Sequence, residues 1–340
     1  MRHAAAAIAV PVATTVAMLY ARLVASLTGP GPRRLAALLP AMALLPVLPL
    51  ALPYYSYRGF SAFVFVWLGE FKLLLLAFGR GPLDPALRPL PFVFTAALPV
   101  KLVDPAAAAG ASRPPPTAAT FKFVVSFAIK VGAMAAIVRV LHAKEEMHRY
   151  TAFALNAVFI YCFLDTVLRG LGAAGGALGM EMEPQFDRPY LSASLQDFWG
   201  RRWNLMASAV LRAAVYDPVR ARSGAPAAGV LTAFLVSGLM HEVVILYMTS
   251  QAPTGRVTAF FALHGACVCA ERWWCARRCE ARPPRAVAAP LVLGFVAGTA
   301  FWLFFPEIYG GGMDDLYLAE MTRFAKSLGL CGRWTGENKF

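Results

Sequence analysis

The sequence predicts an all-α protein that crosses a membrane about eight times. Of its 340 residues, 59% are hydrophobic and only 15% are charged, and the mean hydropathy is +0.57. A helix needs about 20 largely apolar residues to cross roughly 30 Å of hydrocarbon, and several stretches approach or exceed that length. The composition and these stretches together favour a polytopic helical membrane protein over two soluble domains.

The expected spans lie between clusters of Arg, Pro and Gly. They cover residues 4–27, 35–52, 61–78, 121–141, 151–168, 227–249, 257–274 and 286–305. Three prolines, Pro40, Pro46 and Pro49, interrupt the second span and make it the weakest. Arg2 and His3 precede the first apolar run, as in a signal peptide. Its length and the spans behind it favour a retained helix.

The charge distribution indicates a membrane topology. Lys and Arg outnumber Asp and Glu by 32 to 19, a formal charge of +13. These basic residues lie between apolar spans and do not form one soluble basic face, which argues against a nucleic-acid partner. A chain that starts on the lumenal side places the larger share of Arg and Lys in cytosolic loops, in agreement with the positive-inside rule.

An Ala- and Pro-rich stretch, DPAAAAGASRPPPTAA, divides the chain. We expect an N-terminal membrane region of about three spans at residues 1–103, a linker at 104–120, a second membrane region at 121–310 and a C-terminal tail at 311–340. No internal repeat is visible, which lowers the expectation of a transporter built from two related halves.

The long connection between residues 169 and 222 has mixed polarity, and long connections of this kind are usually functional. Its second part, SLQDFWGRRWNLMASAVLRAAVYDPVR, predicts an amphipathic helix at the membrane interface. On one helix, Asp197, Arg201 and Asn204 would share a polar face, with Trp199 and Trp203 on an adjacent stripe. An ordinary interfacial helix explains the tryptophans but not the pairing of Asp197 with Asn204.

His241 and Glu242 lie in LTAFLVSGLMHEVVILYMT, an otherwise apolar span. Ionisable residues inside a membrane are costly and are therefore functional candidates. A zinc protease motif would need a second His at position 245, which is Ile. Neighbours on a helix point about 100° apart, so we expect His241 and Glu242 to have separate partners. A purely structural histidine is the alternative.

Other intramembrane polar residues have weaker signals. His264 and Glu271 fall on one helical face and could complete a polar lining around His241, although a structural role is equally compatible. Lys130 and Asp165 could form a charge pair, or the span lysines Lys72 and Lys130 could snorkel toward the interface.

The cysteines do not predict a metal site. Cys267, Cys269, Cys275 and Cys279 lack a paired CxxC arrangement, and the first two fall within a predicted span. We therefore expect no bound metal.

Three sequence stretches together resemble plant wax synthases, a branch of the membrane-bound O-acyltransferases (MBOAT). SLQDFWGRRWN is followed, after about 37 residues, by the membrane-embedded His-Glu pair; the other stretches are WLGEFKLLLLAFGRGPL and FFALHGACVCAERWW. The resemblance covers most of the chain and implies an MBOAT-like fold, with residues 121–310 as the catalytic region. The sequence departs from the family pattern at Glu70, where the family has Asn.

The resemblance also implies a reaction. A fatty acyl group would pass from acyl-CoA to a long-chain alcohol, giving a wax ester, in the endoplasmic reticulum membrane. Acyl-CoA would be a co-substrate, with no other cofactor. His241 matches the histidine regarded as catalytic, and Asn204 matches the second implicated position. We expect the acyl-CoA entrance to be shaped by Asp197, Trp199, Arg201, Arg202 and Trp203, with the arginines contacting CoA phosphates.

Elementary chemistry agrees with these roles. A neutral imidazole can take the alcohol proton as a general base. An Asn amide can either donate a hydrogen bond to the developing oxyanion or position the hydroxyl. Three alternatives stay open at this point: a sterol as the acceptor, a transporter or channel lined by the intramembrane polar residues, and a non-catalytic scaffold.

Overall fold

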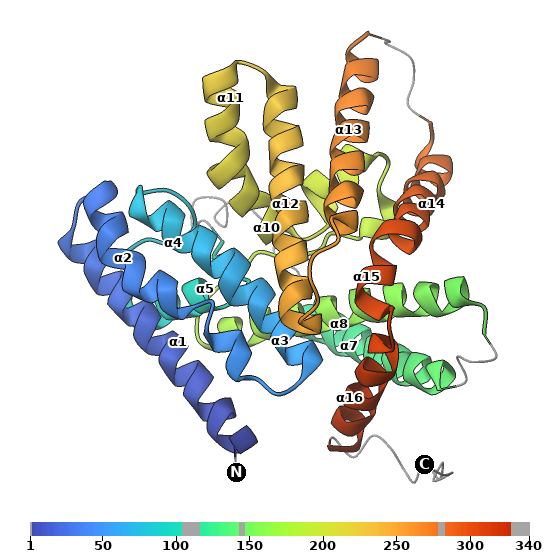
Figure 1. Cartoon of the computed structure of the whole chain (residues 1–340), viewed down its shortest axis with the longest axis horizontal. Helices are drawn as coiled ribbons and strands as arrows, with labels where there is room; N and C mark the ends of the chain where they lie inside the picture. Colours follow the sequence, from blue (N-terminus) through green and yellow to red (C-terminus); the bar gives the residue numbers. More distant parts are fainter. Residues whose placement is uncertain (1, 104–115, 143–146, 278–282, 328–340) are drawn as a thin grey trace. The chain divides into compact units, whose positions relative to one another are not determined.

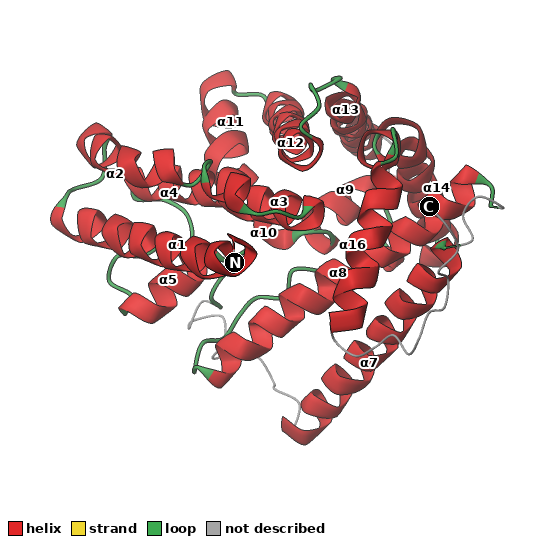
Figure 2. Cartoon of the chain, turned by 60° about the horizontal axis from the view of Figure 1, so that its bottom comes forward, coloured by secondary structure: helices red, strands yellow, loops and turns green. Residues whose placement is uncertain are grey.

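The described part of the chain consists of helices and loops. The computed structural model describes residues 2–103, 116–142, 147–277 and 283–327, and Figure 2 shows no strand in these ranges. One isolated antiparallel bridge joins Leu102 to Met182. The predicted all-α class is confirmed. Residues 104–115 of the predicted linker, and Cys279, lie outside the described residues.

The chain divides into two compact units, one of residues Met1–Ala111 and Leu168–Glu307, the other of Ser112–Val167 and Ile308–Phe340. Unit 1 therefore combines the predicted N-terminal region with most of the second membrane region. Its front elements are α1 (Arg2–Leu27), α2 (Pro32–Leu44), η1 (Leu48–Ala51), α3 (Tyr55–Ala62), η2 (Phe63–Gly69), α4 (Glu70–Ala77) and α5 (Pro89–Ala97).

The rear elements of unit 1 follow α8 (Arg149–Ala177), which begins in unit 2. They are η4 (Pro189–Leu191), α9 (Leu195–Asp197), η5 (Phe198–Arg202), α10 (Leu205–Leu211), η6 (Arg212–Tyr216), α11 (Asp217–Ser223), α12 (Pro226–Thr249), α13 (Arg256–Arg277) and α14 (Arg285–Leu303). Short α15 (Phe305–Tyr309) crosses the boundary into unit 2.

Two buried cations satisfy helix ends in the front of unit 1. Helices α1, α2, α4 and α5 share one apolar core. Arg34 donates to the carbonyl of Leu76 near the end of α4, and Lys72 donates to the carbonyls of Thr95 and Leu98 at the end of α5. Carbonyls in a last turn have no partner within their helix, so buried donors there are stabilising. Lys72 therefore caps a helix instead of snorkelling.

The third span is continuous from Tyr55 to Ala77 but contains the π-helical segment η2. Such widened turns are rare and occur often at functional sites. Trp67 lies in this segment and is 1% exposed, so its indole faces the interior of the unit.

Helices α12 and α13 run side by side, as Figure 1 shows, and small residues allow their close approach. A Cβ built on Gly238 of α12 would lie 2.7 Å from the Cα of Thr258 on α13. A Cβ on Gly265 of α13 would lie 2.9 Å from the Cβ of Phe234 on α12. The two glycines therefore set the distance between the helices.

The prediction of one amphipathic helix from residue 194 onward is wrong. The short α9 and the π-helical η5 end at Trp203, whose backbone is extended, and Asn204 has a left-handed backbone with φ 44°. Asn adopts this conformation more readily than most residues and is a preferred helix N-cap, so it starts a new helix, α10. Asn204 therefore does not continue the helical face of Asp197 and Arg201.

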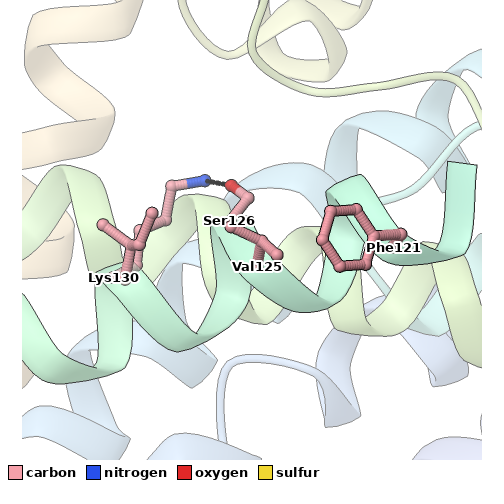
Figure 3. A pocket seen from close by; sticks show the side chains of 5 residues that line it. Phe121, Val125, Ser126 and Lys130 are labelled. Atoms are coloured by element: carbon pink, nitrogen blue, oxygen red, sulfur yellow. Dashed lines mark hydrogen bonds between the residues drawn. The ribbon is translucent and has the colours of Figure 1, made fainter. Parts of the chain in front are cut away.

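Unit 2 contains α7 (Pro116–Leu141), the first part of α8, and α16 (Met313–Ser327). The predicted pairing of Lys130 with Asp165 is confirmed. The Lys130 ammonium also donates to Ser126 Oγ over 2.8 Å, as Figure 3 shows. It lies at a shallow groove on α7 lined by Phe121, Val125, Ser126, Ile129 and Lys130.

Seven helical segments in the described ranges are long and apolar enough to cross a membrane. They are Ala6–Leu27, Pro32–Ala51, Tyr55–Ala77, Phe123–Leu141, Arg149–Ala177, Pro226–Thr249 and Arg285–Leu303. Each overlaps a predicted span, and a multi-pass membrane protein is confirmed. The remaining expected span, 257–274, is helical as α13 but is not among the seven. His264, Glu271 and Arg272 make it too polar.

Candidate active site

His241, on α12, has one bonded and one free ring nitrogen. Its Nδ1 lies 2.7 Å from the carbonyl oxygen of Ser237. A carbonyl oxygen only accepts, so Nδ1 carries the proton and donates, and in the neutral ring Nε2 holds the lone pair. No residue in the described part of the chain hydrogen-bonds to Nε2. His241 can therefore accept a proton at Nε2, as a general base must.

In the described part of the chain, three aromatic rings contact the His241 imidazole. Phe261 of α13 stacks on it with ring centroids 4.4 Å apart. Trp67 of η2 meets it edge to face at 4.6 Å, and Phe304, at the end of α14, does so at 5.7 Å. Contacts of these kinds fix the orientation of a ring and keep its surroundings apolar.

His264, by contrast, has both ring nitrogens occupied. Trp199 Nε1 donates to His264 Nδ1 over 3.0 Å. The indole can only donate, so the His264 proton is on Nε2, which donates to Thr299 Oγ1 over 2.9 Å. Thr299 in turn donates to the carbonyl of Phe295. His264 is fully buried and ties Trp199 to α14, so it has no free lone pair for catalysis.

Glu242 and Glu271 bind helix N-termini. Glu242 accepts from the N–H of Thr258 in the first turn of α13, over 3.1 Å. Glu271 accepts from the N–H groups of Leu195 and Gln196 in the first turn of α9, over 3.3 and 3.0 Å. Carboxylates are favourable at these positions because the first N–H groups of a helix lack partners. The expectation that His241 and Glu242 have separate partners is confirmed, and both glutamates bind helix N-termini of unit 1.

Asn204 presents a free amide donor. Its Oδ1 accepts from the N–H of Ala207 over 3.2 Å, which leaves the Nδ2 protons, and no described residue accepts from them. Met206 and Ala207, in the turn that Asn204 caps, belong to the same apolar cluster as Trp67. No hydrogen bond joins Asn204 to His241 among the described residues. Trp67 contacts the ring of His241 and packs in one cluster with the first turn of α10, which Asn204 caps.

The residues expected at an acyl-CoA entrance separate into buried and exposed ones. Asp197 accepts from Arg202 Nε over 2.7 Å and from the N–H of Ala193 over 3.1 Å. Burial alone would raise the pKa of Asp197, but these hydrogen bonds and the charges of Arg202 and Arg201 hold it below its usual value. The Arg201 side chain is 68% exposed, so its guanidinium is accessible to an anion.

The two tryptophans of the same segment are held in packing contacts. Trp203 stacks on Phe198 with centroids 5.5 Å apart and meets Phe186 edge to face at 5.0 Å. Trp199 meets Phe261, the ring that stacks on His241, at 5.6 Å. Contact of either tryptophan with acyl-CoA stays a prediction.

Sequence reasoning missed the rings around His241. Trp67 and Phe261 lie in WLGEFK and FFALHG, two stretches that carry the family resemblance, but no spacing rule connects either to His241. Phe304 had no sequence signal. Their contacts arise from packing between α12, η2, α13 and the end of α14.

Comparison with known proteins decides the family. Residues 182–263 match the membrane bound O-acyl transferase family. A probable long-chain-alcohol O-fatty-acyltransferase 3 of Arabidopsis thaliana is 38% identical over 83% of this chain and 84% of its own length. The chain belongs to the membrane-bound O-acyltransferase family, in its plant wax synthase branch. The long-chain-alcohol O-fatty-acyltransferase of Simmondsia chinensis is also 38% identical, over 84% of each chain.

Another relative of this O-acyltransferase has a different acceptor in its name. Acyl-CoA--sterol O-acyltransferase 1 of Arabidopsis thaliana is 34% identical over 86% of this chain and 87% of its own length. The family match contains Asn204, His241 and Glu242. Membership of the O-acyltransferase family confirms the prediction that the protein is an enzyme. It argues against the transporter and scaffold alternatives.

Proposed function

We propose that this O-acyltransferase moves a fatty acyl group from acyl-CoA to the hydroxyl of a long-chain alcohol, forming a wax ester. The observation that carries the proposal is the His241 imidazole, whose Nδ1–H is bonded to Ser237 and whose Nε2 is free within an aromatic enclosure. The long-chain-alcohol O-fatty-acyltransferases among its relatives supply the substrate class.

The proposed step moves one proton and exchanges one bond. His241 Nε2 takes the proton of the alcohol as the oxygen attacks the thioester carbonyl carbon. Asn204 Nδ2 donates to the carbonyl oxygen as it becomes negative. The C–S bond then breaks, and the CoA thiolate takes the proton back from the imidazolium. Because the thioester is already activated, acyl-CoA is the co-substrate and no metal or other cofactor takes part.

The surroundings of these groups support apolar substrates. The rings of Trp67, Phe261 and Phe304 offer no charge to a long hydrocarbon chain. The exposed guanidinium of Arg201 suits a CoA phosphate, whereas Arg202 is engaged with Asp197. The endoplasmic reticulum membrane is the proposed location, with acyl-CoA delivered from the cytosol.

A sterol is the second candidate acceptor, because one relative is a sterol O-acyltransferase. Both acceptors present a hydroxyl, and the same imidazole would activate either. Expression in a host without neutral-ester synthesis, fed separately with fatty alcohol and with sterol, distinguishes them by the mass of the ester. We expect wax esters as the main product.

The catalytic assignment is tested with His241→Ala and Asn204→Ala in the same host. Loss of a general base lowers the rate by about 10²- to 10⁴-fold, and loss of one oxyanion donor by about 10²- to 10³-fold. His142→Ala is the matched control, because His142 Nδ1 bonds the carbonyl four residues earlier over 2.7 Å, as His241 does, but its side chain is exposed. Equal ester formation by wild type and His241→Ala would remove the mechanism.

A further inference from the structure

Trp67 has a buried hydrogen-bond donor without a partner. Its side chain is 1% exposed, and its Nε1 is enclosed with no acceptor among the described residues. Most buried indole N–H groups find a partner, because an unpaired one loses its bond to water without replacement. An unpaired donor of this kind in a native interior needs an explanation, and a bound ligand oxygen is one.

The position of Trp67 points to the reacting atoms. Its ring lies edge to face against His241 with centroids 4.6 Å apart. It also packs with Met206 and Ala207, in the turn capped by Asn204. The Trp67 indole thus contacts the proposed base directly and packs in the same apolar cluster as the helical turn that the proposed amide donor caps. Trp67 also lies in the π-helical segment η2, and π-helical turns occur often at functional sites.

We propose that the Trp67 indole N–H is a second oxyanion donor, which binds the thioester carbonyl oxygen together with Asn204 Nδ2. This inference rests on the proposed acyl transfer and adds a catalytic residue to it. As the alcohol oxygen attacks, negative charge moves onto the carbonyl oxygen, and a preorganised N–H in an apolar enclosure stabilises that charge. No bond to Trp67 forms or breaks.

A donor aimed at the oxyanion predicts a specific kinetic pattern. The interaction is stronger in the transition state than with the ground-state carbonyl, so its removal lowers kcat and leaves KM for the alcohol unchanged. Removal of one such donor lowers kcat by about 10²- to 10³-fold. A donor that only held the alcohol would raise its KM and leave kcat at saturation unchanged.

Two variants separate the N–H from the bulk of the ring. Trp67→Phe removes the N–H and part of the ring, and replacement of Trp67 by benzothienylalanine removes only the N–H, because sulfur takes its place. Trp302→Phe is the matched control, since Trp302 lies in the same unit and is 66% exposed. Each purified protein is assayed with acyl-CoA and a long-chain alcohol over a range of pH, and its folding is checked by thermal unfolding.

We expect both Trp67 variants to have a lower kcat and an unchanged KM for the alcohol. The benzothienylalanine protein should unfold at the wild-type temperature. The control Trp302→Phe should have wild-type activity. Wild-type kcat in the benzothienylalanine protein would overturn the proposal. So would a loss that appears in the alcohol KM alone, or that comes entirely from a shifted pH profile, because the N–H would then only brace His241. Absence of ester formation by the wild-type protein would instead refute the proposed function.

Discussion

Replacement of Gly238 by Ala tests how tightly the helix pair α12 and α13 holds the site. The added Cβ would lie 2.7 Å from the Cα of Thr258 and 3.3 Å from the Cβ of Phe261. Ordinary contacts begin near 3.4 Å. The helices must therefore separate by about 0.7 Å, because the nearer atom belongs to the backbone and no side-chain rotation relieves the overlap.

The expected cost has two parts. Overpacking of this kind destabilises a protein by about 1–3 kcal/mol, which corresponds to a fall of roughly 2–10 °C in the apparent unfolding temperature. Phe261 moves with α13, and it stacks on His241 at 4.4 Å. A displacement approaching 1 Å at a reacting group can reduce a rate by about 10²-fold, so we expect a loss of roughly 10- to 100-fold in ester formation.

Gly298→Ala is the matched control for this change. Gly298 lies within α14, and a Cβ there would meet nothing within 4 Å. Both substitutions gain the same helix propensity, up to about 1 kcal/mol, so their difference isolates the contact with Thr258. Thermal unfolding in detergent and ester formation are measured for both proteins. Equal stability and activity in the two variants would refute the packing argument.

Two further predictions concern the segment that packs beside α13. Trp199→Phe removes the donor to His264 Nδ1 and leaves a buried acceptor unpaired. We expect a loss of about 1–3 kcal/mol in the free energy of unfolding. An unchanged unfolding temperature would contradict the tautomer assigned to His264. Asp197 has a pKa below its usual value. Its ion pair with Arg202 therefore stabilises the fold at pH values above the unfolded-state pKa of about 3.9. This stabilisation is lost as the pH falls below that value and through the folded-state pKa. The unfolding temperatures of wild type and Asp197→Asn, measured between pH 3 and 7, test this contribution. Parallel dependences of the unfolding temperature on pH in the two proteins would contradict the lowered pKa of Asp197.

The apolar runs predict most of the fold because membrane burial depends on local composition. A span needs only enough consecutive apolar residues, so seven of the expected spans are recognisable without knowledge of their neighbours. The helical periodicity predicted one continuous helix through Trp203 and Asn204, and this prediction was wrong. There a left-handed residue and a side-chain cap overrode the regular pattern.

The sequence by itself determined that the chain is a multi-pass helical protein, that His241 is an unusual residue in an apolar span, and which family it resembles. Only the tertiary structure decided which histidine is free to accept a proton. His241 and His264 each lie within a span expected from the sequence, and no sequence pattern around them shows which one has a free ring nitrogen. They differ because Trp199 and Thr299, distant along the chain, occupy both nitrogens of His264. The contacts of His241 within the described ranges are with a backbone carbonyl and aromatic rings. Hydrogen bonds between residues far apart in the chain depend on packing, and no local pattern encodes them.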